Sequence, residues 1–157
     1  MLAEERTFVA IKPDGVQRGL VGEVLSRFER KGFKIIGMKL IQVTDKQASD
    51  HYAEHEGKPF YPRLINYIQS GPVVAMVVKG FGAVDSVRHI VGATNPANAD
   101  VGTIRADLAQ VMEFNVIHAS DSIASAEREI AIYFNENEIL DTWKTKTEEL
   151  IEKDDLL

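Results

Sequence analysis

The segment Pro72–Lys79, with the sequence PVVAMVVK, constrains the fold of this chain more than any other feature. It is apolar at nearly every position, so neither face of a strand built from it could lie against water. Such a run is typical of a central strand that is buried on both sides. The segment therefore predicts a sheet that is covered on both faces.

Strand and helix patterns alternate along the rest of the chain. Strands are expected at Thr7–Lys12, Phe33–Val43 and Asn115–His118, with a turn at Lys12–Gly15. Apolar spacings of three and four residues predict helices over Val21–Phe28, Thr44–His55, Leu64–Ile68, Val84–Val91 and Ile123–Phe134. This order has too few strands for a doubly wound sheet. It predicts an α+β, ferredoxin-like (βαββαβ) sandwich, whose four-stranded antiparallel sheet is covered by helices.

Length and composition exclude several classes of protein. The 157 residues fit one compact domain, and none of their apolar stretches is long enough to cross a membrane. No basic-then-apolar leader is visible at the N-terminus, so we expect a cytoplasmic protein. The absence of cysteine excludes disulfides, a thiol nucleophile and thiolate metal sites. A net charge of −6 argues against bulk binding to nucleic acid or to an anionic membrane.

The negative charge is concentrated at the C-terminus. Residues 136–157 hold eight acidic and three basic side chains, whereas residues 1–135 are nearly neutral and could still form a basic pocket. An apolar stripe runs through the same end of the chain. We therefore expect a main domain over residues 1–138 and an acidic tail over residues 139–157. The tail is predicted to form an amphipathic helix over Asp141–Leu157 that carries Trp143.

The end of the last predicted strand is a candidate site for chemistry. His118 lies there, after the irregular stretch Ala93–Phe114, and side chains beside loops meet solvent and ligands. Glu129 lies eleven residues further on, in the next predicted helix, from which its carboxylate could orient the imidazole. If the fold brings Lys12, Arg88, Thr94 and Arg105 to the same place, the set suits phosphoryl transfer.

Another pair of histidines has metal-binding spacing. His51 and His55 are four residues apart on a predicted helix, but Tyr52 stands where a zinc protease has its glutamate. We therefore interpret the pair as two polar helix histidines. The glycine patterns of the phosphate-binding loop and of the dinucleotide-binding fold are both incomplete.

Seven short motifs occur in one register from about residue 5 to about residue 135. They are KPDGVQR (12–18), HY (51–52), KPF (58–60), SGPV (70–73), GATNP (92–96), GTIR (102–105) and NVIHASDS (115–122). Each motif alone is weak, but the ordered set is highly specific. In this set the chain resembles the nucleoside diphosphate kinase family.

The resemblance implies a ferredoxin-like fold and a ping-pong transfer of the terminal phosphoryl group from a nucleoside triphosphate to a nucleoside diphosphate. His118 would be the nucleophile, phosphorylated on Nδ1. Glu129 would accept a hydrogen bond from the other ring nitrogen, and Ser120 would support that carboxylate. Mg²⁺ would bridge the phosphates, which removes the need for a cluster of protein ligands.

The resemblance also assigns residues to each part of the nucleotide. The expected contacts are Arg88, Thr94 and Arg105 with the phosphates, Lys12 and Asn115 with the ribose hydroxyls, Tyr52 with the transferred group, and Phe60 and Met112 with the two faces of the base. Stacking on an aromatic ring depends little on which base is bound. A single Phe60 platform therefore predicts broad base specificity.

Several positions differ from the family's usual residues: Ala106 and Ala119 replace glycine, Val101 proline, Leu108 phenylalanine, Phe114 arginine, and Met112 a smaller aliphatic residue. An alanine disfavours positive φ, so the backbone should shift slightly where glycine was needed. None of the changes removes a group with an expected role in catalysis. We therefore expect an active enzyme with altered stability or affinity.

Assembly and substrate leave alternatives open. The family forms dimers that assemble further into tetramers or hexamers, and the sequence does not decide between these assemblies. In an alternative function, phospho-His118 passes its group to a protein, and the acidic tail contacts that partner. A third hypothesis is a non-catalytic binding module. The complete set of Lys12, Arg88, Arg105 and His118 argues against a module that has lost its activity.

Overall fold

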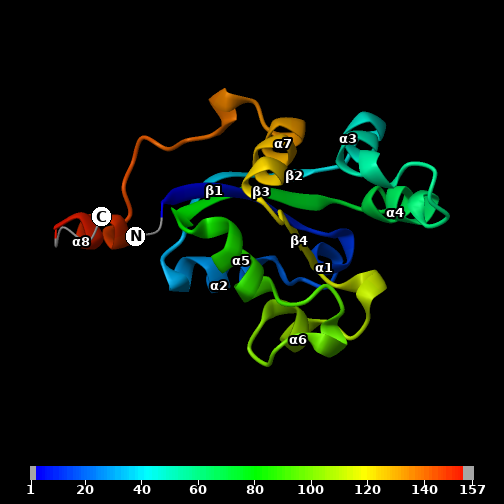
Figure 1. Ribbon diagram of the computed structural model, residues 1–157, viewed down its shortest axis with the longest axis horizontal. Helices are drawn as coiled ribbons and strands as arrows, with labels where there is room; N and C mark the ends of the chain where they lie inside the picture. The colour runs from blue at the N-terminus through cyan, green and yellow to red at the C-terminus, as the bar shows by residue number, and fades with distance from the viewer. Residues whose placement is uncertain (1–2, 154–157) are drawn as a thin grey trace.

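The computed structural model describes residues 3–153 and contains a four-stranded antiparallel sheet with helices on both faces (Figure 1). The strands are β1 (Glu4–Ile11), β2 (Lys34–Ile41), β3 (Val73–Phe81) and β4 (Ile117–Ala119). They lie in the order β2-β3-β1-β4, and each neighbouring pair is antiparallel. This is the strand order of the ferredoxin-like sandwich, so the predicted fold class is confirmed.

Strand β3 lies inside the sheet, where its apolar sequence places it. All residues of Val73–Val78 are buried, and successive side chains enter two different cores. Met76 and Val78 pack on the side covered by α2 (Val21–Lys31) and α5 (Ala83–Val91). The neighbouring side chains pack on the side covered by α3 (Asp45–His51), α4 (Tyr61–Ile68) and α7 (Ile123–Tyr133).

Local signals in the sequence set several helix ends. Gly32 ends α2 with φ at 96°, a conformation that glycine adopts without strain. Thr44 begins α3 in a capping box with Gln47, in which each side chain bonds to the backbone of the other residue. Ser122 begins α7 by accepting a hydrogen bond from the backbone N–H of Ser125.

Several predicted element bounds are wrong. In place of the expected turn after β1 there is the short helix α1 (Pro13–Gln17), which proline permits at the first helical position because its φ is already helical. Helix α3 ends at His51, and a separate 3₁₀ turn, η1 (Ala53–His55), follows it. The stretch expected to be irregular contains α6 (Ile104–Leu108) and the 3₁₀ turns η2 (Pro96–Asn98) and η3 (Met112–Phe114).

The tail contains the predicted helix, but the helix is shorter than expected. After the 3₁₀ turn η4 (Glu136–Glu138), α8 spans only Lys146–Lys153, so Trp143 lies before it. The last four positions of the expected helix, 154–157, lie outside the described residues. Figure 1 shows α8 at the opposite end of the molecule from α4.

The tail is held by a buried lysine of its own chain. The Lys34 side chain is only 3% exposed, and its Nζ lies 2.8 Å from Asp141 Oδ1 and 3.5 Å from Glu148 Oε2. Lys34 also donates to the backbone carbonyl of Trp143, and Lys79 Nζ lies 2.6 Å from the other oxygen of Asp141. Part of the acidic charge of the tail is therefore paired within the chain. Within residues 3–153, no helix has the length and apolar character needed to cross a membrane.

Candidate active site

The short strand β4 presents His118 on one face of the sheet. Side chains alternate along a strand, so Ile117 and Ala119 are buried on the α2 and α5 side, and His118 faces the other side. The His118 side chain is 25% exposed. It therefore combines a fixed backbone position with access to a ligand.

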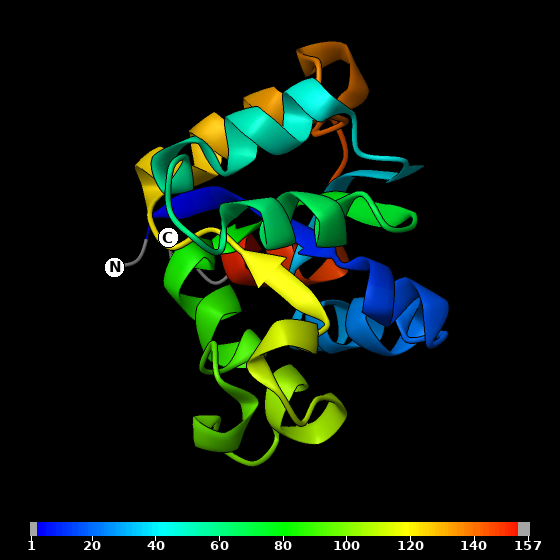
Figure 2. The ribbon, with the colours of Figure 1, turned by 90° about the vertical axis from the view of Figure 1, so that its right-hand side faces the viewer.

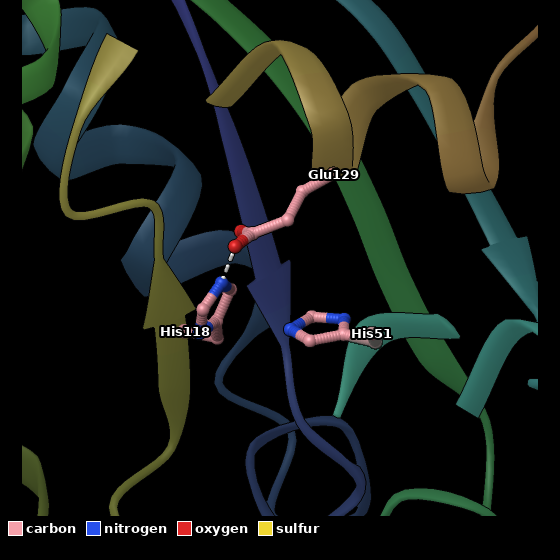
Figure 3. Close-up of side chains that lie close together, drawn as sticks. All are labelled: His51, His118 and Glu129. Carbon is pink, nitrogen blue, oxygen red and sulfur yellow. Dashed lines mark hydrogen bonds and ion pairs between the residues drawn. The ribbon is translucent and has the colours of Figure 1, made fainter. Parts of the chain in front are cut away.

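Glu129, from α7, holds the imidazole of His118 (Figure 3). His118 Nε2 lies 2.6 Å from Glu129 Oε1, and the Ser120 hydroxyl donates to the same oxygen at 2.8 Å. Burial raises the pKa of Glu129. The hydrogen bond and the charge of His118 act in the opposite direction and contribute to a pKa that lies below its ordinary value. The ionised carboxylate only accepts. The hydrogen of the neutral ring is therefore on Nε2, and Nδ1 carries the lone pair.

His51, interpreted from the sequence as a polar helix histidine, lies at the end of α3 but is buried beside His118. It is 5% exposed, and its ring centroid lies 4.7 Å from that of His118, at an interplanar angle of 70°. Its Nδ1 lies 2.7 Å from the Tyr133 hydroxyl, whereas its buried Nε2 has no hydrogen-bond partner. Burial, and then the charge of His118, lower the pKa of His51 to about 3. The sequence signals for this position are its membership of the HY motif and its spacing of four residues from His55.

The buried His51 should make the protein sensitive to acid. Its pKa is near 6.5 in an unfolded chain and about 3 in the folded protein. The unfolded state therefore takes up a proton below pH 6.5 that the folded state does not. We expect the free energy of unfolding to fall from pH 6.5 toward pH 3, by up to about 1.4 kcal/mol per pH unit from this group.

Urea unfolding at pH 7 and pH 5 measures this effect. His51→Gln should show a shallower fall in the free energy of unfolding than the unmodified protein, because glutamine does not titrate. His55→Gln is the matched control and should keep the steep dependence. Equal slopes for His51→Gln and the unmodified protein would contradict the prediction.

A cavity of about 440 Å³ lies beside His118. Seven residues predicted to bind the nucleotide or to take part in catalysis line it: Lys12, Tyr52, Phe60, Thr94, Met112, Asn115 and His118. Sequence reasoning missed five others: His55, Arg63, Leu64, Tyr67 and Glu113. Figure 2 shows β4 between α3 and α4 on one side and the α6 segment on the other, and the cavity is lined by residues from both sides. Phe60 and Met112 are each about half exposed, which leaves both accessible to a planar ligand.

Lys12 and Asn115 connect the two walls of this cavity. Lys12 Nζ donates to Asn115 Oδ1 at 2.8 Å, and Asn115 Nδ2 donates to the backbone carbonyl of Thr94 at 2.9 Å. Burial, and then the charge of Arg105, lower the pKa of Lys12 to about 8. The lysine is therefore mostly charged at neutral pH but loses its charge in mildly alkaline solution.

The two arginines of the predicted site occupy different positions. Arg88 lines a second cavity, of about 180 Å³, together with Tyr52, His118 and Glu129, and donates to the Ala119 carbonyl at 3.0 Å. Arg105 lines neither cavity and is 3% exposed.

Arg105 instead binds backbone carbonyls. Its Nη1 donates to Gly92 at 3.0 Å, its Nη2 to Ile117 at 2.6 Å, and its Nε to Asn115 at 3.4 Å. Burial, and then the charge of Arg88, lower the pKa of Arg105 to about 10, so it stays charged at neutral pH. It thus places a positive charge behind the site and joins β4 to the loop that carries Thr94.

A strained residue precedes β4. Val116 is the one non-glycine residue among positions 3–153 with positive φ, at 74°. Its N–H donates to Asp14 Oδ2 at 3.1 Å, its carbonyl accepts from the Lys12 N–H at 2.8 Å, and the Tyr67 hydroxyl donates to Asp14. Burial raises the pKa of Asp14. These contacts hold the backbone that leads into His118, and Asp14 is a further residue that sequence reasoning missed.

Comparison with known proteins agrees with this geometry. The family model described as nucleoside diphosphate kinase matches residues 5–139. The chain belongs to the nucleoside diphosphate kinase family. A nucleoside diphosphate kinase of Archaeoglobus fulgidus is 57% identical over 147 residues, which make up 94% of this chain and 97% of the relative. One from Staphylococcus aureus is 60% identical over 135 residues, or 86% of this chain and 91% of the relative.

Solved structures of nucleoside diphosphate kinases have the same fold. A halophilic one from Halobacterium salinarum, in complex with CDP, superposes with a TM-score of 0.91 at 45% identity, over 95% of this chain and 99% of that chain. A family protein from Babesia bovis gives a TM-score of 0.90 at 44% identity, over 94% and 99%. The chain is thus an enzyme of nucleotide phosphotransfer.

The chain's departures from the usual residues of a nucleoside diphosphate kinase cause little backbone strain. Neither Ala106 nor Ala119 has positive φ, so a methyl group is compatible with the backbone at both positions. Val101 is 97% exposed, and Phe114 packs edge-on against Tyr67, with ring centroids 5.5 Å apart. The shift expected at the two alanines is therefore not required by their conformation.

Proposed function

We propose that this enzyme transfers the terminal phosphoryl group of nucleoside triphosphates to nucleoside diphosphates by a ping-pong mechanism, through a phosphohistidine on His118 and with broad base specificity. The contact between His118 Nε2 and Glu129 carries the proposal. It holds the hydrogen on Nε2 and leaves the nucleophilic lone pair on Nδ1. The partial exposure of His118 beside two cavities, one lined by Lys12 and the other by Arg88, supports the same role.

The nucleotide is proposed to lie along the larger cavity with its phosphates toward His118. Phe60 and Met112 receive the base, and Lys12 and Asn115 bind the ribose hydroxyls. Arg88 and Thr94 hold the phosphates, while the buried Arg105 adds a second positive charge and fixes the backbone. Phosphoryl transfer depends mainly on charge neutralisation and in-line positioning, which this arrangement provides.

In the first half-reaction, the His118 Nδ1 lone pair forms a bond to the terminal phosphorus. The bond from that phosphorus to the bridging oxygen breaks, and the nucleoside diphosphate leaves. The ring gains positive charge, which the Glu129 carboxylate stabilises through Nε2–H. In the second half-reaction, a terminal oxygen of another diphosphate forms a bond to the phosphorus of the phosphohistidine. The bond between phosphorus and Nδ1 breaks, and its electron pair returns to Nδ1 of neutral His118. Burial, and then the charge of Glu129, raise the pKa of Tyr52 to about 12, so its hydroxyl remains a donor beside the transferred group.

Mg²⁺ fits this site as an ion carried by the nucleotide. Besides Thr94, the side chains proposed at or behind the phosphates are Arg88 and Arg105, which are cationic and cannot ligate a metal ion. Bound there with the phosphates, Mg²⁺ would neutralise part of their charge. The protein's own groups orient the phosphates and the nucleophile.

Intact-protein mass spectrometry tests the mechanism. Brief mixing with Mg²⁺-ATP should add one phosphoryl group per chain, which should survive base and be lost in acid. Adding GDP should remove the group as GTP forms. A mass that never changes although nucleotide binds would contradict the phosphohistidine intermediate.

The charge of Lys12 should make kcat/KM depend on pH in alkaline solution. Since the pKa of Lys12 in the free enzyme is about 8, the lysine loses its charge above that pH. We expect kcat/KM to fall above pH 8, because this ratio reports the free enzyme. A Lys12→Met variant should have a lower kcat/KM at pH 7 and no such fall, whereas persistence of the fall in Lys12→Met would assign it to another group.

Replacing Phe60 with alanine should lower kcat/KM by a similar factor for every base, because the ring is proposed to stack on the base. Base stacking on an aromatic ring contributes about 1–3 kcal/mol, so kcat/KM should decrease on the order of tenfold or more. Steady-state assays with ADP, GDP, CDP and UDP should show similar decreases, since the ring does not read the identity of the base. Phe114→Ala, outside the two cavities, serves as the control. A loss confined to one base would contradict broad specificity.

We also propose that the chain assembles into homodimers that associate further, as a tetramer or a hexamer. Strand β2 lies at an edge of the sheet and exposes the apolar side chains of Met38 and Leu40, which supports self-association. Light scattering during size-exclusion chromatography would determine the number of subunits. The division into a catalytic domain over 1–138 and a tail over 139–157, and the cytoplasmic location, stay predictions.

A further inference from the structure

Three metal-binding side chains from different elements meet at the nucleophile. His51 comes from α3, His118 from β4 and Glu129 from α7, and one potential ligand atom of each lies within 4.8 Å of those of the other two. Figure 3 shows a ring nitrogen of His51 directed toward His118, next to the contact between His118 and Glu129. His51 belongs to one of the seven motifs, but the proposed mechanism gives it no role.

The His51 ring is held in place and has one nitrogen free to bind a ligand. Tyr133 holds its Nδ1 at 2.7 Å, so the ring has a fixed orientation. Its Nε2 is buried without any hydrogen-bond partner, which is costly for a polar atom in a protein interior. A group that bonds to Nε2 would remove this cost.

We propose that His51, His118 and Glu129 form a binding site for a divalent transition metal of the zinc class, and that the bound metal inhibits the enzyme. Two imidazoles and one carboxylate suit Zn²⁺, which binds through three protein groups and leaves a fourth position for water. Mg²⁺ prefers oxygen ligands and does not match this set. The cavity of about 180 Å³ is lined by all three residues and gives the ion a path and room for water.

The surrounding charges set the expected strength of binding. Arg128 Nη2 lies 3.5 Å from Glu129 Oε2, and Arg88 lines the same cavity, so both oppose a cation. Glu54 and Asp121 also line the cavity and partly offset these charges. We therefore expect a dissociation constant on the order of micromolar, weaker than that of a structural zinc site.

Inhibition follows from the number of lone pairs on a neutral imidazole. The ring has one nitrogen with a hydrogen and one with a lone pair. When Zn²⁺ bonds to His118 Nε2, the hydrogen of that nitrogen moves through solvent to Nδ1, and no net proton is released. Nδ1 then has no lone pair with which to attack phosphorus. This step rests on the proposed function, whereas metal binding itself does not.

Binding is tested on the metal-free full chain without nucleotide. Calorimetric titration with Zn²⁺, and the visible absorbance of Co²⁺ as a spectroscopic substitute, should each show one site per chain. His51→Gln should weaken Zn²⁺ binding at least about tenfold, as expected for the loss of a ligand. His55→Gln and His89→Gln are matched controls and should bind normally. Unchanged binding in His51→Gln, or no saturable site in the unmodified protein, would overturn the proposal.

A measurement on the unmodified chain covers the case in which His51→Gln does not fold. The ¹⁵N resonances of the His51 and His118 rings should both shift when Zn²⁺ is added, while that of His89 should not. If neither of the two resonances moves at a saturating Zn²⁺ concentration, the metal is bound elsewhere and the assignment is wrong.

Inhibition is then measured as the initial rate of phosphorylation by Mg²⁺-ATP. Zn²⁺ should lower this rate at least about tenfold in the unmodified protein, and a zinc-selective chelator should restore it. His51→Gln should keep most of its own zinc-free rate, which also controls for Zn²⁺ bound to ATP. Zinc binding without loss of rate would overturn the inhibitory role. Absence of phosphorylation in zinc-free protein would instead refute the proposed function and leave the binding result intact.

Discussion

Replacing His118 with alanine should abolish phosphoryl exchange between nucleotides, with a loss of at least about 10⁴-fold in kcat. Alanine removes the Nδ1 lone pair that forms the bond to phosphorus, and no other side chain at this position can supply it. Mass spectrometry after mixing with Mg²⁺-ATP should detect no added phosphoryl group. A coupled assay with ATP and GDP should detect no GTP above background.

His55→Ala is the appropriate control for this variant. His55 lines the same cavity from the η1 turn but takes no part in the hydrogen bond between His118 and Glu129. It should keep the phosphorylated mass after mixing with Mg²⁺-ATP. Full activity in a folded His118→Ala protein would refute the assignment of the nucleophile.

Replacing Arg105 with alanine should reduce both stability and activity. The guanidinium is buried and donates to the carbonyls of Gly92, Asn115 and Ile117. The Asn115 carbonyl also accepts from the Ile117 N–H at 2.8 Å, so the carbonyls of Gly92 and Ile117 are the two that would lose their donors. Acceptors left unpaired inside a protein cost about 1–3 kcal/mol each, so the loss of two donors should lower the free energy of unfolding by about 2 kcal/mol or more. The loss of a positive charge behind the phosphates should lower kcat on the order of 10²-fold.

Two further variants separate these effects of Arg105. Arg105→Lys keeps the charge but loses the planar fork, so it should recover part of the rate while remaining destabilised. Arg88→Ala removes a charge whose guanidinium donates to only one backbone carbonyl, and should lower the rate with less effect on urea unfolding. An Arg105→Ala protein as stable as the unmodified chain would show that the three backbone contacts have little energetic value.

Local sequence chemistry explains which elements could be predicted. Three features act within a few residues, so their effects are visible in the sequence. They are the apolar run of β3, the capping box at Thr44 and the glycine that ends α2. The bounds that were wrong depend on smaller differences. Proline at position 13 permits both a turn and a helix, and only the packing of neighbouring segments selects α1.

The sequence by itself determined the fold class, through the apolar pattern of its strands, and the family, through seven ordered motifs. It also indicated seven of the residues around the larger cavity, and all of these except Met112 lie in the motifs. Only the tertiary structure decided which faces are buried. It placed His51 against His118 and turned Arg105 toward backbone carbonyls instead of the cavity. The physical reason is that burial and hydrogen bonding between distant segments depend on how helices pack on the sheet, and residue spacing along one segment does not encode this.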